Sequence, residues 1–183
     1  GVILGNAEDE FKSFVEKSGI PAAWTILGVS ALPTSHELNV GMVGMHGNYG
    51  PNLLTNECDL LVAIGMRFDD RVTGDPKTYA NQAKIIHLDI DPAEINKNIK
   101  VEVPIIGDCK ESLKLIIEKI EKRSHEKWIS KFDDLMKIEF DKVINSDLNP
   151  SKKGLTMGES IIAINEQTNG EAIIVTDVGQ HQM

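Results

Sequence analysis

Short apolar runs alternate with stretches of helical spacing along the first 124 residues. Each apolar run has the length of a strand, and several are bounded by Gly, Pro or Asp. Strands that alternate with helices predict an α/β fold with a doubly wound, mostly parallel sheet and helices on both faces. The predicted strands are residues 2–4, 22–27, 59–64, 84–89 and 101–106.

Polar residues mark the starts of the helical stretches. Asn6, which precedes three acidic or small residues, is a predicted N-cap, and Pro51 is predicted to begin a helix. Asp108 and Glu111 have the spacing of a capping box, with Asp in place of Ser or Thr. The helix that follows is expected to place Leu113, Ile116, Ile117 and Ile120 on its inner face.

The pattern changes near residue 124 and begins again near residue 156. Residues 125–155 keep helical spacing at first and then become polar, which is typical of a linker. Thr156 and Glu159 form a second capping box, and residues 172–175 are one more predicted strand. One helix and one strand cannot enclose a core. We therefore expect a domain at 1–124, a linker at 125–155 and, at 156–183, an incomplete C-terminal α/β piece of a longer protein.

Composition and charge exclude several classes of protein. Nineteen Lys and Arg against 28 Asp and Glu give a net charge of -9 over 183 residues, which argues against a nucleic-acid partner. No apolar run is long enough to cross a membrane, and no secretory leader is recognised. Cys58 and Cys109 match no metal-ligand spacing and are too few to staple a secreted fold. A cytoplasmic protein is expected.

A charged segment, Gly65–Gly74, directly follows the buried strand at 59–64 and is the strongest sign of a ligand site. Arginines in this segment, Arg67 and Arg71, are expected at the carboxyl edge of the sheet, where doubly wound folds bind nucleotides. Guanidinium groups there can clamp a pyrophosphate or stack on an aromatic ring. The same residues also fit a solvated cluster of ion pairs with Asp69 and Asp70, and only their position favours binding.

Other strand ends carry weaker signals. The glycine-rich stretch 41–50 fits an ordinary surface loop, although about thirty residues of unstructured loop are uncommon unless they have a function. Asp89 ends the strand at 84–89 and is a candidate acceptor for ribose hydroxyls, whereas Asp91 is interpreted as a helix cap. His87, inside that strand, is interpreted as a core histidine with its hydrogen bonds satisfied. The polar end at 176–183 offers donors for a diphosphate.

Catalysis by this chain alone is not expected. The sequence contains no Ser-His-Asp or Cys-His arrangement, no zinc spacing and no P-loop. We therefore assign no catalytic residue and no metal ligand.

Taken in order, the segments 44–47, 65–74, 87–92, 107–108 and 178–183 resemble the large catalytic subunit of acetolactate synthase (acetohydroxyacid synthase). The resemblance implies a three-domain parent, of which this chain is the FAD-binding middle domain, a connecting segment and the start of the thiamine diphosphate-binding domain.

The resemblance also implies site residues. Arg71 matches a position near the substrate channel, and Gln180 and His181 match the place where the cofactor diphosphate is held. The positions that match FAD contacts are Thr25, Ile26, Val43, Gly44, Met45, His46, Gly65, Met66, Arg67, Phe68, Asp69, Asp89, Ile90, Asp108 and Cys109.

For the parent, the resemblance implies condensation of pyruvate with a second 2-keto acid and loss of CO2, using thiamine diphosphate and Mg2+, in branched-chain amino-acid biosynthesis. FAD would be structural, and the general acid/base and the metal ligands would lie outside this chain, which alone would be inactive. A homo-oligomer with a regulatory small subunit is expected. Two alternatives stay open: another FAD-containing thiamine diphosphate enzyme such as pyruvate oxidase, and a non-catalytic nucleotide-binding module.

Overall fold

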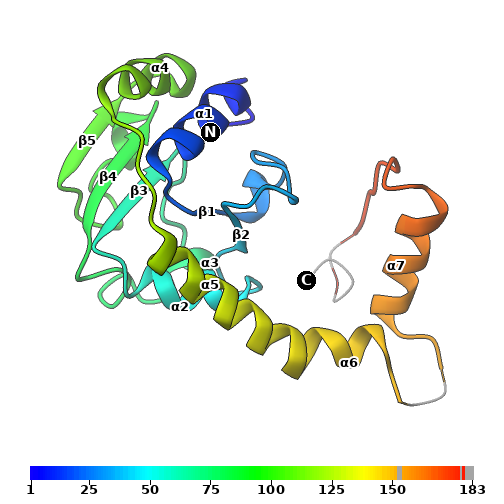
Figure 1. Ribbon diagram of the computed structural model, residues 1–183. Coiled ribbons are helices and arrows are strands. Elements are labelled where there is room, and N and C mark those ends of the chain that lie inside the picture. The colour runs from blue at the N-terminus through cyan, green and yellow to red at the C-terminus, as the bar shows by residue number, and fades with distance from the viewer. Residues whose placement is uncertain (152–153, 178, 180–183) are drawn as a thin grey trace. The chain divides into compact units, whose positions relative to one another are not determined.

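The computed structural model describes residues 1–151, 154–177 and 179 (Figure 1). The chain forms two compact units, Gly1–Asp133 and Asp134–Met183. The boundary falls inside helix α5 (Glu126–Glu139), nine residues beyond the predicted end of the first domain. None of the helices in the described ranges is long and apolar enough to cross a membrane.

Two parallel sheets organise the first unit. Strands β3 (Leu60–Ile64), β4 (Lys84–Asp89) and β5 (Val103–Ile106) form one, in that order. Strands β1 (Ala22–Trp24) and β2 (Asn39–Met42) form the other. Because Ile64 pairs with Leu88 and Asp89 pairs with Ile106, the segments that leave β3, β4 and β5 emerge at one edge. The predicted parallel α/β architecture is confirmed, although its strands are divided between two sheets.

Helices α1 (Glu8–Ser18) and α4 (Cys109–Lys119) lie side by side over one face of the β3–β5 sheet (Figure 1). Their inner faces bury Phe14, Val15 and Leu113 against Leu88 of β4. For α4 this is the face that the helical spacing predicted, because apolar residues three and four apart share one side of a helix.

The other face of the β3–β5 sheet packs against less regular structure, with 3-10 helix η2 (Pro92–Glu94) among its connections. Large side chains from the strands and from several connecting segments meet on this face. The buried members of this second cluster are Ala63, Phe68, Tyr79, Ala80, Ile85, Ile99 and Val101.

Tyr79 makes stability in this cluster depend on pH. Burial raises the pKa of its hydroxyl from 10.0 to about 12, whereas the unfolded tyrosine ionises near its ordinary value. Unfolding therefore releases a proton between these two values, so stability falls as pH rises through about 10 and stops falling near about 12, with a total loss of roughly 3 kcal/mol.

Replacing Tyr79 by phenylalanine is expected to remove this part of the alkaline loss. Urea unfolding of both proteins, from about pH 9 to about pH 12, measures it. A shallower decline should persist in the variant, because burial also raises the pKa of the Cys109 thiol from 9.0 to about 11. Equal slopes in the two proteins would contradict the prediction.

The second unit is helical in its described part. It contains the end of α5, a π-helix η3 (Phe140–Ile144), and helices α6 (Asn145–Leu148) and α7 (Met157–Gln167). The predicted capping box before α7 is confirmed, because Thr156 and Glu159 each bond the backbone of the other. The Thr156 hydroxyl also donates to the carbonyl of Asp147, at 2.8 Å.

Two predicted strands do not form. Residues 2–4 are turns, in which the N–H of Gly5 donates to the carbonyl of Gly1 and that of Ala7 to Val2. Residues 172–175 lack strand structure, and Ile173 and Val175 are 93% and 89% exposed. A strand needs a neighbour for its backbone hydrogen bonds, and no described segment pairs with either of these.

Several predicted boundaries were also wrong. Asn6 has φ 47° and does not cap α1, whose N-cap position is held by Ala7. The strand predicted at 22–27 ends at Trp24, because a 3-10 helix η1 (Ile26–Gly28) follows, and β5 begins two residues late. Helix α2 (Tyr49–Thr55) begins before Pro51. The presumed loop of about thirty residues contains both β2 and α2.

Candidate functional site

The segment after β3 turns sharply at the edge of the sheet. Gly65 has φ 59°, its N–H donates to the carbonyl of Leu88 at 2.7 Å, and its Cα lies against Gly1, where a side chain would collide. Phe68 also has a positive φ, 53°, which is uncommon for a bulky residue, and its ring is 2% exposed. The two turns leave Arg67 between them with its side chain in solvent.

Arg67 and Asp69 form a charged pair at this edge. The guanidinium donates to the Asp69 carboxylate at 2.6 Å, and the two side chains are 69% and 28% exposed. Asp69 also caps helix α3 (Asp70–Thr73) by accepting from the N–H of Arg71 at 3.1 Å. The Arg71 N–H, followed by the Arg67 guanidinium, lowers the pKa of the Asp69 carboxyl. Arg67 therefore stays beside an ionised partner at neutral pH while most of its surface remains open to a ligand.

The glycine-rich loop lies against α3. The N–H of Met45 donates to the carbonyl of Arg71 at 2.7 Å, and a Cβ on Gly44 would approach that oxygen to 2.9 Å. The side-chain amide of Asn52 bonds both the N–H and the carbonyl of Gly44, each at 2.8 Å. Met45 and His46 are exposed. The structure thus brings two of the predicted segments, 43–46 and 65–71, together.

Thr25 and Ile26 join the same neighbourhood from the smaller sheet. The N–H of Val43 donates to the carbonyl of Trp24 at 2.9 Å, which places the end of β1 beside the start of the loop. Thr25 holds the N-cap position of η1, and Ile26 is 54% exposed.

Asp89 and Ile90 leave the end of β4. One oxygen of Asp89 accepts from the N–H of Asp91 at 2.9 Å, so part of this carboxylate is used in the local turn. Asp91 caps η2 by accepting from the N–H of Ala93 at 2.9 Å, as predicted. Ile90 is 70% exposed. Asp89 itself is 12% exposed, which leaves it only partly accessible.

Asp108 and Cys109 begin α4 beyond the end of β5. Asp108 caps the helix by accepting from the N–H of Glu111 at 3.0 Å, which confirms the predicted cap. Cys109 is buried in the core, and burial keeps its thiol protonated at neutral pH. Cys109 can therefore offer a ligand its backbone rather than a reactive sulfur.

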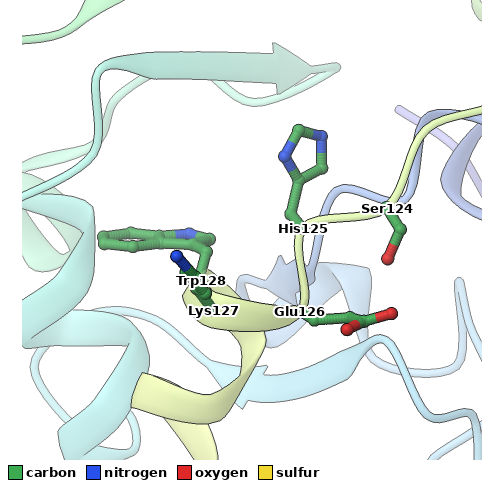
Figure 2. Close-up of a pocket in the computed structure, with 5 residues that line it drawn as sticks. All are labelled: Ser124, His125, Glu126, Lys127 and Trp128. Atoms are coloured by element: carbon green, nitrogen blue, oxygen red, sulfur yellow. The ribbon is translucent and has the colours of Figure 1, made fainter.

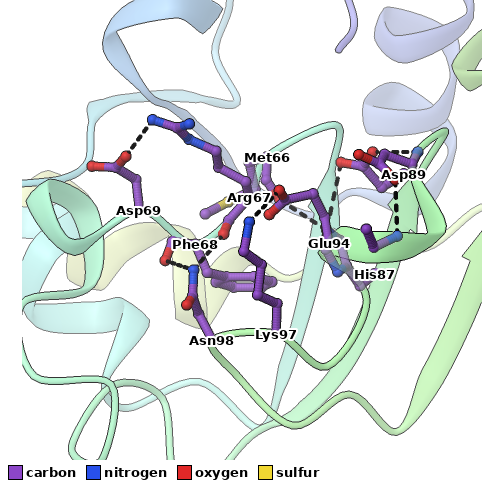
Figure 3. Close-up of polar contacts among 11 residues, drawn as sticks. Met66, Arg67, Phe68, Asp69, His87, Asp89, Glu94, Lys97 and Asn98 are labelled. Atoms are coloured by element: carbon purple, nitrogen blue, oxygen red, sulfur yellow. Dashed lines mark hydrogen bonds and ion pairs between the residues drawn. The ribbon is translucent and has the colours of Figure 1, made fainter.

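A cavity of about 270 Å³ lies beside Arg67, and Figure 3 shows most of its lining. Sequence reasoning missed four of its members: Pro76, and three residues that end or follow η2. Glu94 and Lys97 pair at 2.7 Å, and the Asn98 amide donates to the carbonyls of Arg67 and Phe68, both at 3.1 Å. The cavity is lined by Arg67, Phe68, Asp69, Asp70, Pro76, Glu94, Lys97 and Asn98.

The cavity collects only part of the predicted set. Thr25, Ile26, the loop 43–46, the pair Asp89–Ile90 and the pair Asp108–Cys109 do not line it. Gln180 and His181 lie outside the described residues. One oxygen of Glu94 is buried without a hydrogen-bond partner in the described structure. The sequence offered one sign that pointed to Glu94, which is that it follows the end of β4 by five residues.

A larger cavity, of about 390 Å³, lies at the start of α5 (Figure 2). Five consecutive residues, 124–128, line it, and the His125 and Trp128 side chains do not converge on a common point. None of the strand-end residues contributes. Because chemistry needs convergent polar groups, we place the candidate site at the smaller cavity and the adjoining sheet edge.

Residues 1–116 match the family model described as thiamine pyrophosphate enzyme, central domain. The chain belongs to this family. Three relatives over its whole length are a probable acetolactate synthase large subunit of Methanocaldococcus jannaschii (40% identical) and acetolactate synthase large subunits of Lactococcus lactis (41%) and Corynebacterium glutamicum (42%). The chain covers 32%, 31% and 29% of these relatives, respectively, and so spans about a third of their length.

Membership of the central-domain family agrees with the parallel α/β architecture of the first unit. The match ends inside α4, before the predicted linker.

Proposed function

We propose that this chain is part of an acetolactate synthase large subunit and that its first unit binds FAD at the carboxyl edge of the β3–β5 sheet. The observation that carries the proposal is the exposed Arg67 guanidinium, fixed between two positive-φ turns beside a cavity, in a central-domain family member. The names of the full-length relatives support the identity of the parent.

The residues present fit an adenine dinucleotide. Arg67 supplies a positive group for a diphosphate or a flat ring. The unpartnered oxygen of Glu94 can accept from a ribose or ribityl hydroxyl. The exposed side chains of Ile90 and Ile106 offer apolar surface at the same edge. The cavity alone is too small for the whole ligand, which would extend along the edge toward residues 43–46.

In this proposal FAD has a structural role, as the resemblance implies. The remaining predicted contacts belong to it: Thr25, Ile26, Asp89, Asp108 and Cys109 would border the dinucleotide. Arg71 would lie near a substrate channel, and Gln180 and His181 would help to hold the diphosphate of thiamine diphosphate.

The whole-protein activity is also a proposal. The parent would join two pyruvates, or pyruvate and 2-oxobutanoate, with loss of CO2, using thiamine diphosphate and Mg2+ held mostly by other parts of the subunit. It would be a homo-oligomer with a regulatory small subunit and would reside in the cytoplasm. The relatives' names favour this function over pyruvate oxidase or a non-catalytic module.

The full-length gene product that carries this chain provides the test. Incubated with pyruvate, thiamine diphosphate, Mg2+ and FAD, it should release CO2 and form acetolactate, whereas the 183-residue chain should form none. Stopped-flow spectroscopy should show no flavin reduction at the rate of turnover. Flavin reduction by pyruvate at that rate, without acetolactate, would instead indicate an oxidase.

A further inference from the structure

One buried histidine connects the interior of the sheet to the proposed cofactor segment. His87 lies in β4, two residues before the strand ends, and is 0% exposed. Its Nε2 lies 2.8 Å from the carbonyl oxygen of Met66, the residue directly before Arg67 (Figure 3). A carbonyl can only accept, so Nε2 carries the proton and donates it to Met66.

The other ring nitrogen has no partner. With the proton on Nε2, Nδ1 is an acceptor, and it is buried without a hydrogen bond in the described structure. The expectation that His87 is a core histidine with its hydrogen bonds satisfied is therefore confirmed for Nε2 and wrong for Nδ1. The carboxylate of Asp89, 3.8 Å from Nε2, is beyond hydrogen-bond distance. Leaving one polar atom buried and unpaired opposes folding, so packing alone does not account for a histidine at this place.

The imidazole also fixes the ring of Phe68. The two rings meet edge to face, with centroids 5.0 Å apart and an interplanar angle of 76°. Phe68 holds a positive φ, a conformation that persists for a bulky residue only where its surroundings enforce it. His87 thus contacts the residues on both sides of Arg67, through a hydrogen bond on one side and a ring contact on the other.

A second side chain completes the support. The Asn98 amide donates to the carbonyls of Arg67 and Phe68. Two side chains from other segments therefore bond three successive carbonyls: His87 bonds that of Met66, and Asn98 bonds those of Arg67 and Phe68. The backbone under the Arg67 guanidinium is fixed at three successive carbonyls, while the guanidinium itself stays exposed.

We propose that His87 is a positioning residue for the dinucleotide: its Nε2–H and its ring hold the turn 66–68 in the conformation that aims Arg67 at the ligand. The proposal rests on the FAD site described above. His87 does not touch the ligand and acts only through Met66 and Phe68. The proposal goes beyond that site because it makes the affinity for FAD depend on a hydrogen-bond donor inside the sheet.

The test compares two substitutions in the 183-residue chain, titrated with FAD and followed by flavin fluorescence. His87→Leu replaces the imidazole by an apolar side chain and so removes the donor, and it should weaken FAD binding about tenfold. His87→Gln can place an amide N–H near the position of Nε2 and should restore affinity to within about threefold of wild type. Rescue by glutamine separates a hydrogen bond that aims the turn from general damage to the core.

Ile85→Ala is the matched control. Ile85 lies on the same strand and the same face, two residues farther from the edge, and is 4% exposed. It should lower stability to urea while leaving the FAD dissociation constant unchanged. Long-range 1H–15N correlation of the imidazole provides a readout without FAD, and should show the proton on Nε2 and none on Nδ1.

The outcomes distinguish the two proposals. Failure of the wild-type chain to bind FAD would overturn the proposed site and, with it, the positioning role. If wild type binds and His87→Leu binds equally well, or if glutamine fails to restore affinity, only the role of His87 is overturned. If a variant does not fold, the spectrum of the wild-type imidazole still tests the proposal. A proton on Nδ1 in that spectrum would contradict it.

Discussion

Replacing Arg67 by alanine should weaken FAD binding by about 10- to 100-fold. Removing one hydrogen bond between charged groups costs roughly 1.5 to 3 kcal/mol, and about 1.4 kcal/mol corresponds to a factor of ten. The guanidinium is 69% exposed and makes one described ion pair, with Asp69, so its loss should change folding little. Titration of FAD into wild type and variant, with parallel urea unfolding, measures both effects.

Arg123→Ala is the matched control for this change. Arg123 donates to Glu121, two residues before it, at 2.7 Å, and its side chain is 67% exposed. It therefore resembles Arg67 in charge, exposure and pairing but is distant from the strand-end segments in the sequence. Equal weakening by both variants would show that the effect is one of net charge, and unchanged binding in Arg67→Ala would remove Arg67 from the site.

Replacing Leu113 by alanine should destabilise the first unit by about 2 to 5 kcal/mol. Leu113 is 0% exposed at the centre of α4 and packs in the cluster that contains Phe14, Val15 and Leu88. Truncation removes the transfer free energy of the lost methyl groups and leaves a cavity. Urea unfolding by circular dichroism, with its midpoint and slope, measures the loss.

Leu115, two residues further along the same helix, provides the comparison. Its side chain is 63% exposed, so Leu115→Ala should change the free energy of unfolding by no more than about 0.5 kcal/mol. Similar losses from the two substitutions would mean that α4 does not pack on the sheet with the predicted face.

Strands β3 and β4 could be predicted from the sequence because apolar clusters cover both faces of their sheet. The run at 84–89 was predicted with its observed bounds, and that at 59–64 differs by one residue. Short runs rich in Ile, Leu and Val can be recognised as strands without knowledge of the segments beside them. Residues 172–175 have a similar composition but form no strand in the described structure, because a strand depends on partners that the local sequence does not encode.

The features of the candidate site likewise divide into those that the sequence could predict and those that it could not. Roles that depend on neighbours in the sequence could be predicted: Asp91 and Asp108 cap the elements that follow them, and Arg67 pairs with Asp69. Contacts between distant segments could not. The hydrogen bond from His87 to Met66 joins residues 21 apart, and that from Asn98 to Phe68 joins residues 30 apart. The positive φ of Phe68 gave no signal, since nothing local favours it.

FAD titration of the wild-type 183-residue chain tests the central claim most directly, because it asks whether the ends of β3, β4 and β5 make a dinucleotide site without the rest of the parent. The account predicts saturable binding of one FAD per chain, with a change in flavin fluorescence and a dissociation constant that rises in the Arg67→Ala variant. The absence of saturation at high micromolar FAD, in a chain shown to be folded by its cooperative urea transition, would contradict it.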